Sequence, residues 1–198
     1  MAAPSWFDSL RRSFPDVPIE ENNGIKTTEF LEATESLTTL FDLLGSVAFT
    51  PVKNDLLGNV KKIREYQLTH VTQSETLQSL AADERSQKKK TATEGLLWLV
   101  RGLDFTAQAL RHNLNNPTVE LAESFRTAYT TTLKPYHSFI VKPIFSAAMS
   151  ATPYRKDFYA KLGPDTEENM SRLNIDVDAL EKRVVILKGF LDRPEIKF

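Results

Sequence analysis

The chain has 198 residues, with 25 basic and 26 acidic side chains and a formal net charge of −1. A charge balance this even provides no global field that would recruit nucleic acid or an anionic membrane, so either role would need a local patch. The length, with 41% hydrophobic and 10% aromatic residues, predicts one globular domain over residues 1–198 rather than a disordered chain.

The sequence contains no cysteine. Disulfides, thiol nucleophiles and thiolate metal sites are therefore excluded. The N-terminal segment lacks the basic stretch and apolar run of a secretory signal, and no stretch has the length of a membrane span, so we expect a cytoplasmic protein.

Apolar residues recur at intervals of three and four along most of the chain, which predicts a mainly helical fold. In chain order, the longer predicted helices cover residues 28–44, 51–69, 93–114, 117–133, 135–149 and 177–190. Shorter helices are predicted at 6–14, 74–82 and 167–173. Their short connections, without an internal repeat, predict a packed helical domain rather than a solenoid.

Residues with known end preferences mark several of these helices. Asn116 before Pro117 places a capping side chain ahead of a proline at the first helical position. Thr91 and Glu94 have the spacing of a capping box, in which two side chains satisfy backbone N–H groups at the start of a helix. We therefore expect helices to begin close to residues 91 and 117.

The predicted helix at 51–69 carries Asp55, Asn59 and Lys62 on one strip of its surface, because side chains four and three residues apart share a helix face. An apolar face that includes Val52 and Leu56 borders this strip. Periodicity alone favours a solvated edge, with a weak ion pair between Asp55 and Lys62, over a binding site.

The three histidines, His70, His112 and His137, have no metal-ligand spacing, so no metal site is predicted. His137 lies among aromatic and aliphatic residues, where a hydrogen-bonded core histidine is the favoured interpretation. Trp98, within a strongly apolar helix, is likewise favoured as core packing. Nucleophile motifs and phosphate-binding glycine loops are missing from the sequence, so no catalytic residue and no cofactor is assigned.

Three segments, taken together, favour a binding site over the solvated edge and the core packing considered above. They are FDLLGSVAFTPVKNDLLGNVKKI, LLWLVRGLDF and YHSFIVKPIFSAAMSATPYRKDF. In order and separation they resemble the glycolipid transfer protein family, most closely its fungal members, including the heterokaryon-incompatibility protein. The most specific element is D-x-x-x-N-x-x-K with an upstream F-x-P, and the likeness extends over nearly the whole chain. The resemblance implies an all-α, two-layer sandwich of about eight helices that encloses an apolar lipid pocket.

The resemblance also implies a polar recognition centre at the mouth of that pocket, formed by Asp55, Asn59, Lys62, Trp98 and His137. In such a centre the acid, amide and lysine bind the headgroup, the tryptophan stacks on the first sugar ring, and the histidine holds the ceramide amide carbonyl. The matching apolar positions near the hydrocarbon chains are Phe41, Phe49, Val52, Phe105, Leu133 and Phe145.

Phe139 falls where relatives often carry a tryptophan that dips into the membrane interface, and with Ile140 and Tyr154 it is predicted to dock on the membrane surface. The terminal Phe198 is given no role. The resemblance thus implies a monomeric, non-enzymatic carrier of glycosphingolipids such as glucosyl- or galactosylceramide, with transient membrane contact and no nucleic-acid partner.

Other interpretations stay open from the sequence. An enzyme could use Asp55 and His137 as an acid–base pair. A sensor of membrane lipid would need the same pocket as a carrier. Arg101 near Trp98 leaves a ceramide-phosphate carrier open, but family members that carry ceramide phosphate place a cation where this chain has Trp98, so the tryptophan favours a glycosphingolipid.

Overall fold

The structure is a computed structural model that describes residues 4–197, so Phe198 lies outside the described residues. Its α-helices are α1 (Thr27–Thr38), α2 (Leu40–Leu43), α3 (Thr50–Thr69), α4 (Leu77–Ser86), α5 (Thr91–Asn115), α6 (Leu121–Thr131), α7 (Val141–Ser150), α8 (Arg155–Leu162) and α9 (Glu167–Leu191). Its short 3₁₀ helices are η1 (Trp6–Ser9), η2 (Phe14–Asp16), η3 (Val47–Phe49) and η4 (Thr72–Ser74). In the described range, β-structure is limited to isolated bridges, which confirms the predicted all-α fold.

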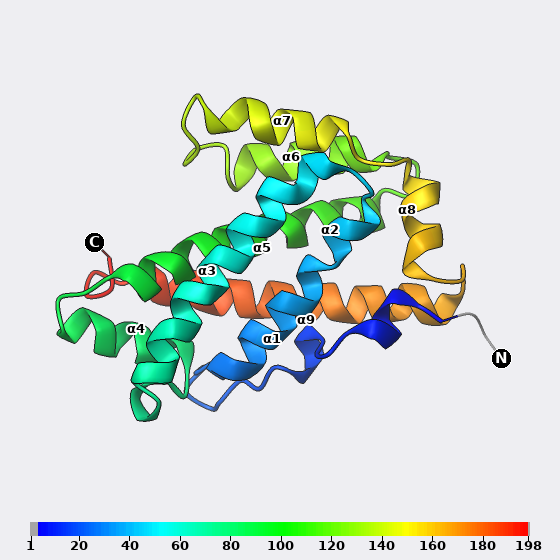
Figure 1. The fold of residues 1–198 in the computed structure, drawn as a ribbon. Coiled ribbons are helices and arrows are strands. Elements are labelled where there is room, and N and C mark those ends of the chain that lie inside the picture. The colour runs from blue at the N-terminus through cyan, green and yellow to red at the C-terminus, as the bar shows by residue number, and fades with distance from the viewer. Residues whose placement is uncertain (1–3, 198) are drawn as a thin grey trace.

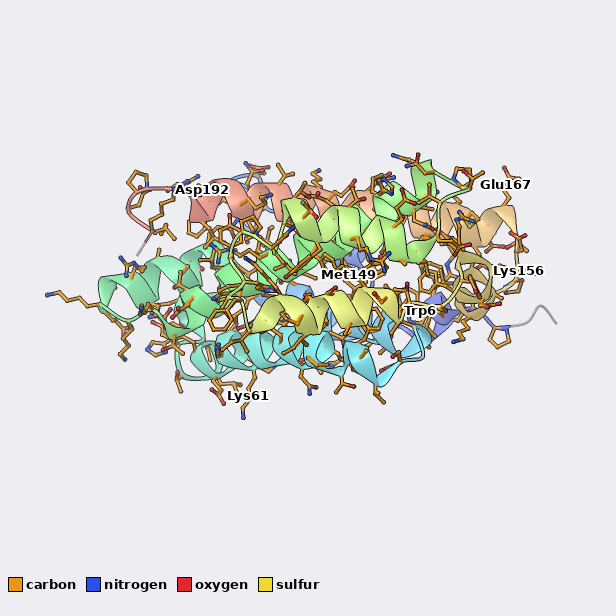
Figure 2. The ribbon with its side chains drawn as sticks, turned by 90° about the horizontal axis from the view of Figure 1, so that it is seen from above. Trp6, Lys61, Met149, Lys156, Glu167 and Asp192 are labelled. Carbon is orange, nitrogen blue, oxygen red and sulfur yellow. The ribbon has the colours of Figure 1, made fainter. Side chains whose placement is uncertain are left out.

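The long helix α5 lies between the other long helices. The structure has two layers, one with α3 and the other with α9, and α5 packs against both (Figure 1). Seen from above, α3 and α9 run along opposite sides of the molecule (Figure 2). Helix α6 packs on α5, and α7 packs on α6.

Both ends of the chain join one apolar core, which runs from Trp6 to Ile196. The N-terminal segment is fastened to α9 by polar contacts. Asp176 accepts a hydrogen bond from the backbone N–H of Phe14 at 3.0 Å, and Arg183 donates to the carbonyl of Val17.

Two glycines allow α3 and α5 to lie very close together. A Cβ added to Gly102 would lie 2.7 Å from Cδ2 of Leu56, and a Cβ on Gly95 would lie 3.2 Å from Cβ of Lys62. Because glycine lacks a side chain, α3 can approach the α5 backbone at both points. The two contacts are seven residues apart on α5 and therefore fall on one helix face.

The helix predicted at 28–44 is divided into α1 and α2 at Thr39. The Thr39 hydroxyl donates to the carbonyl of Ser36 at 2.7 Å and accepts from Nε1 of Trp6 at 2.8 Å. The threonine side chain thus engages both the helix backbone and the N-terminal segment, a contact that helical periodicity does not encode.

Two predicted helix starts are wrong. Helix α6 begins at Leu121 rather than at residue 117, because Asn116 donates to the carbonyl of His112 at 2.8 Å and so closes the end of α5. Helix α7 begins at Val141 rather than at residue 135, after a stretch of turns. In both places a proline follows the end of one helix instead of beginning the next.

The last part of the chain is helical as predicted, but the helices differ from the predicted ones in length and number. The stretches expected at 167–173 and 177–190 form the single helix α9, and the short helix α8 was not predicted. Thr166 caps α9 by accepting from the backbone N–H of Asn169 at 3.2 Å. Gly163, with φ of 145°, separates α8 from α9 in a conformation that favours glycine.

The predicted capping box at Thr91 and Glu94 is also wrong, because another helix caps α5. The Glu84 carboxylate, buried at the end of α4, accepts from the backbone N–H of Ala92 at 2.9 Å and of Thr93 at 2.7 Å. It also accepts from the Thr93 hydroxyl at 2.7 Å. A carboxylate at a helix N-terminus is favourable because the free N–H groups carry partial positive charge.

We expect Glu84→Ala to lower the free energy of unfolding by about 3 kcal/mol, since it removes a charged acceptor and leaves buried N–H groups unpaired. Urea unfolding of the purified protein measures the change. Glu94→Ala is the matched control, because Glu94 is the acid that the sequence pattern places in the cap. A larger loss for Glu94→Ala than for Glu84→Ala would contradict this account of the helix start.

Candidate functional site

The polar strip predicted on α3 is present as a connected set of side chains. Nδ2 of Asn59 donates to Oδ2 of Asp55 at 3.3 Å, and Nζ of Lys62 donates to Oδ1 of Asn59 at 3.1 Å. The amide therefore links the acid to the base, instead of the ion pair expected between Asp55 and Lys62. Asn59 is buried, whereas Asp55 and Lys62 are open to solvent, and the neighbouring Lys61 points away from the molecule (Figure 2).

The close approach of α3 and α5 brings this strip beside the aromatic part of the site. The aliphatic portion of Lys62 packs over Gly95, which lies one turn before Trp98 on α5. The half-buried indole of Trp98 stacks with the ring of His137, at a centroid separation of 6.2 Å and an interplanar angle of 22°. The structure thus places groups from α3, α5 and the α6–α7 connection in one region.

His137 is held by two residues that sequence reasoning did not single out for this role. The Tyr129 hydroxyl lies 3.2 Å from Nδ1 of His137, and the Phe145 ring lies 4.5 Å from the imidazole, centroid to centroid. Phe145 was predicted as a pocket residue, whereas Tyr129 was missed. Because Tyr129 engages one ring nitrogen, it fixes the orientation of the imidazole.

The surroundings of the site shift the pKa values of Asp55, His137 and Tyr129 in the direction that favours their neutral forms. Desolvation raises the pKa of the Asp55 carboxyl, and the attraction of Lys62 offsets this only in part, although one side of Asp55 faces water. Burial, and to a smaller extent the charge of Lys142, lowers the pKa of His137 from 6.5. Burial also raises the pKa of Tyr129. The imidazole is therefore neutral at pH 7 and can both donate and accept a hydrogen bond.

Arg101 lies three residues after Trp98 on α5 and contacts two aromatic rings. Its guanidinium carbon is 3.6 Å from the ring centroid of Tyr136 and 4.8 Å from that of Trp98. Burial lowers the pKa of Arg101, with Tyr136 acting in the opposite direction. These cation–π contacts hold the arginine against the aromatic rings and help to fix the indole.

The predicted hydrocarbon-binding residues are buried and lie close to one another. Phe41 stacks on Phe49 at 6.1 Å, and Phe105 contacts Phe145 at 6.2 Å between ring centroids. Phe125, which was not predicted, joins the two pairs through Phe49 at 6.2 Å and Phe105 at 5.5 Å. We call Phe41, Phe49, Phe105, Phe125, Tyr129 and Phe145 the aromatic cluster.

Val52 and Leu133, the other two predicted pocket residues, are also buried in the same core. Through the contact of Phe145 with His137, the aromatic cluster reaches the site that contains Trp98. Where the resemblance implies a lipid pocket, this structure has rings in direct contact. The polar groups lie at one end of this apolar interior.

The residues predicted to dock on membranes are exposed. Phe139 is 81% exposed, Ile140 64% and Tyr154 73%. Ile144, one turn after Ile140 on α7, adds a further exposed apolar side chain that the sequence analysis did not include. Residues 139 and 140 immediately precede α7, and residue 154 precedes α8, so the exposed side chains flank α7.

Within residues 4–197, the histidine and acidic side chains form no cluster of three or more that could hold a metal ion. No helix in the same range combines the length and the apolar character needed to cross a bilayer. The candidate site consists of the polar strip, the indole of Trp98, the imidazole of His137 and the apolar interior beside them.

Comparison with known proteins places this arrangement in a family. Residues 25–164 match the family described as glycolipid transfer protein (GLTP). The chain belongs to this family. A glycolipid transfer protein of Aureobasidium melanogenum is 60% identical over 194 residues, which cover 98% of this chain and 96% of that protein.

A second relative is longer than this chain. Pleckstrin homology domain-containing family A member 8 of Mus musculus is 34% identical over 197 residues, which cover 93% of this chain and 38% of that protein. This chain thus spans somewhat more than a third of the length of the mouse relative.

Solved structures of GLTP proteins have the same fold. HET-C2, a fungal glycolipid transfer protein, superposes with a TM-score of 0.95 at 56% identity and covers 98% of this chain and 100% of its own. FAPP2, described as selecting simple glycosphingolipids with the GLTP-fold, superposes at 0.85 with 32% identity and coverage of 96% and 95%. These matches confirm the family resemblance and the two-layer helical fold. Mouse ceramide-1-phosphate transfer protein shares the fold, with a TM-score of 0.84 at 20% identity over 96% of each chain.

The lowered pKa of His137 predicts a specific dependence of stability on pH. The unfolded chain takes up a proton on this histidine near pH 6.5, while the folded protein does so only at lower pH. The contribution of His137 to stability is therefore fully present above pH 6.5 and is lost as the pH falls below that value.

We expect the free energy of unfolding to fall less between pH 7 and pH 5 in His137→Asn than in the unsubstituted protein, as measured by urea unfolding at each pH. Asparagine can still reach Tyr129 but does not titrate in this range. Gln73→Asn changes an exposed side chain that does not titrate, and as a control it should keep the steeper slope. Equal slopes for His137→Asn and the unsubstituted protein would show that His137 is not held neutral.

Proposed function

We propose that this protein is a non-enzymatic carrier that binds a glycosphingolipid of the glucosyl- or galactosylceramide type and transfers it between membranes. The observation that supports this most strongly is the position of the polar strip and the Trp98–His137 pair at one end of the aromatic cluster. A lipid with a sugar headgroup and long hydrocarbon chains has the same division into a polar end and an apolar body. Residues 1–198 form one glycolipid transfer protein domain in this proposal.

The polar groups suit a sugar linked to an amide. Sugar hydroxyls donate and accept, so the Asp55 carboxylate, the Asn59 amide and the Lys62 ammonium can each bind one or more of them. Asp55 would also accept from the N–H of the ceramide amide. An apolar competitor would leave these side chains unpaired, and this gives the site its selectivity.

The two rings have separate roles in this proposal. The indole face of Trp98 offers a flat surface on which the first sugar ring can lie. His137 would hold the ceramide amide carbonyl by donating from the ring nitrogen that does not face Tyr129. The neutral imidazole, kept so by burial, can make this bond without bringing a charge to the edge of the apolar interior.

The hydrocarbon chains set the energy scale of transfer. Each methylene group exposed to water costs about 0.8 kcal/mol, so an acyl chain of roughly eighteen carbons resists leaving a bilayer by about 14 kcal/mol. An apolar interior lined by the aromatic cluster, with Val52 and Leu133, offers the chain an environment of similar free energy. Binding is then reversible, and net transfer follows the lipid gradient without an energy source.

Uptake requires the interior to open. Neighbouring rings of the aromatic cluster lie between 5.4 and 6.3 Å apart, centroid to centroid, so a chain can enter only if they separate. The segment between α6 and α7 consists mainly of turns, and α7 packs chiefly on α6 and η3. Displacement of α7 would separate Phe145 from Phe105, and also from Tyr129 and His137.

Transfer needs no chemical step, and the site does not pair the groups that an enzyme would need. Asp55 is hydrogen-bonded to Asn59, whereas His137 faces Tyr129, so each has its own partner. A carrier leaves the lipid intact. The alternative role of a lipid sensor would use the same site and would differ only in passing the binding event on to another protein.

Arg101 supports a second candidate, a carrier of ceramide phosphate. Its guanidinium lies 4.8 Å from the Trp98 ring centroid, close enough to serve a phosphate if the rings rearranged. In this structure, however, Tyr136 and Trp98 cover the arginine, and the indole occupies the position where a cation would suit phosphate better. The sugar is therefore the preferred headgroup.

Membrane contact would be brief and would involve Phe139, Ile140 and Tyr154. Their exposed rings and aliphatic chain can enter the interface without a membrane-spanning helix. The protein is proposed to act as a monomer in the cytoplasm. Its net charge of −1 favours reversible attachment over lasting attraction to an anionic surface.

We expect Trp98→Ala and Asp55→Asn each to reduce transfer of fluorescent galactosylceramide between vesicles at least about tenfold, through loss of stacking and of charge-assisted hydrogen bonds respectively. Glu65→Gln changes an exposed carboxylate to an amide on the same helix and should transfer normally. Trp98→Phe keeps a ring and should retain more activity than Trp98→Ala. Normal transfer by both Trp98→Ala and Asp55→Asn would reject the headgroup assignment.

We expect Phe139→Ala to weaken partitioning onto phosphatidylcholine vesicles without glycolipid several-fold, because an apolar ring no longer enters the interface. A sedimentation assay measures the bound fraction separately from lipid uptake. Val185→Ala removes an exposed apolar side chain from α9, which is 68% exposed at this position, and should partition normally. Unchanged binding of Phe139→Ala would remove Phe139 from the docking surface.

A further inference from the structure

No packing contact in the described structure requires a glycine at position 58 of α3. It lies in the interior of the helix, is exposed, and a Cβ added there would have nothing within 4 Å. Glycine in a helix interior is less favourable than alanine. An alanine at this position would therefore fit the structure and stabilise it.

At each of the other glycines, either the local structure favours glycine or the residue lies away from the proposed headgroup site. Gly95 and Gly102 allow the approach of α3, and Gly45 and Gly163 have positive φ. Gly24 has side-chain atoms 2.9 Å from an added Cβ. Gly189, near the end of α9, is the one other glycine of the seven with open surroundings, and no residue of the proposed headgroup site lies on that helix.

Gly58 lies within the polar strip. It follows Asp55 by one turn, precedes Lys62 by one turn and adjoins Asn59. At 100° per residue, position 58 is about 60° from Asp55 and about 40° from Lys62 around the helix axis. Both groups lie to the same side of position 58 around the axis, and position 58 lies between them along the axis. A side chain there would border the surface that joins them, on the side away from Asn59, and would crowd a sugar ring that reaches both.

We propose that Gly58 is a specificity-determining residue that forms the floor of the sugar-binding site. The missing side chain lets a pyranose ring approach the α3 backbone, so that its hydroxyls reach Asp55 and Lys62 together. Glycine is the residue that permits such close approach of a ligand to the backbone. This inference rests on the proposed function, because it requires the ligand to carry a sugar.

Lys62 has the capacity that this arrangement requires. Its ammonium has three donors, and the hydrogen bond to Asn59 engages one of them. Asp55 likewise accepts one hydrogen bond from Asn59 and has further acceptor sites. Both groups are open to solvent, so unpaired donors and acceptors of opposite charge flank the open surface over Gly58.

The proposal predicts that stability and transfer change in opposite directions. Gly58→Ala and Gly58→Leu should fold and should have a melting temperature equal to or above that of the unsubstituted protein. Galactosylceramide transfer should fall about tenfold in Gly58→Ala, the loss expected when one charge-assisted hydrogen bond is broken, and further in Gly58→Leu. Gly189→Ala makes the same change in α9 and should gain stability without losing transfer.

The experiment measures transfer of fluorescent galactosylceramide between vesicles, with thermal unfolding and vesicle partitioning of each variant. Unchanged partitioning of the Gly58 variants is expected and would separate headgroup binding from docking. Normal transfer by both Gly58→Ala and Gly58→Leu would overturn the inference but leave the proposed function intact. A lower melting temperature for Gly58→Ala would also overturn it, while failure of the unsubstituted protein to transfer galactosylceramide would instead reject the proposed function.

Discussion

The close approach of α3 and α5 is the constraint on which the candidate site depends. Leu56 packs against Gly102, and the aliphatic part of Lys62 packs against Gly95. Because Gly95 lies one turn before Trp98, this contact sets the polar strip of one helix beside the indole of the other. A side chain at either glycine would force the helices apart and widen the distance between the groups that are proposed to share one sugar.

The site combines polar groups with partial burial, and this has an energetic consequence. Burial raises the pKa of Asp55 and lowers that of His137, so in both cases the surroundings disfavour the charged form. A bound headgroup that donates to the carboxylate would compensate for its lost hydration. The polar strip therefore holds the Asp55 carboxylate less favourably than a fully solvated helix edge would.

Helical periodicity predicted most of the long helices, because each buries an apolar stripe that local spacing reveals. It failed where distant residues intervene. Trp6 helps Thr39 to divide the first helix, Glu84 caps α5 from α4, and Asn116 closes the end of α5 instead of capping the helix that follows. The family resemblance, rather than spacing, singled out Trp98 and His137. Phe125, Tyr129 and Gly58 escaped notice because their significance depends on neighbours, or on empty space, that only the folded structure reveals.

An aromatic interior whose rings contact one another suits a reversible carrier better than a large preformed hollow. An apolar cavity would have to stay empty or hold water without polar partners, and either would cost stability. In the proposed mechanism, contacts among rings such as Phe105, Phe125 and Phe145 take the place of lipid in the unloaded protein. A hydrocarbon chain then exchanges one set of dispersion contacts for another, so the difference in free energy between loaded and unloaded interiors stays small. The sugar contacts at the rim can therefore decide which lipid is retained, while the chain can still return to a bilayer.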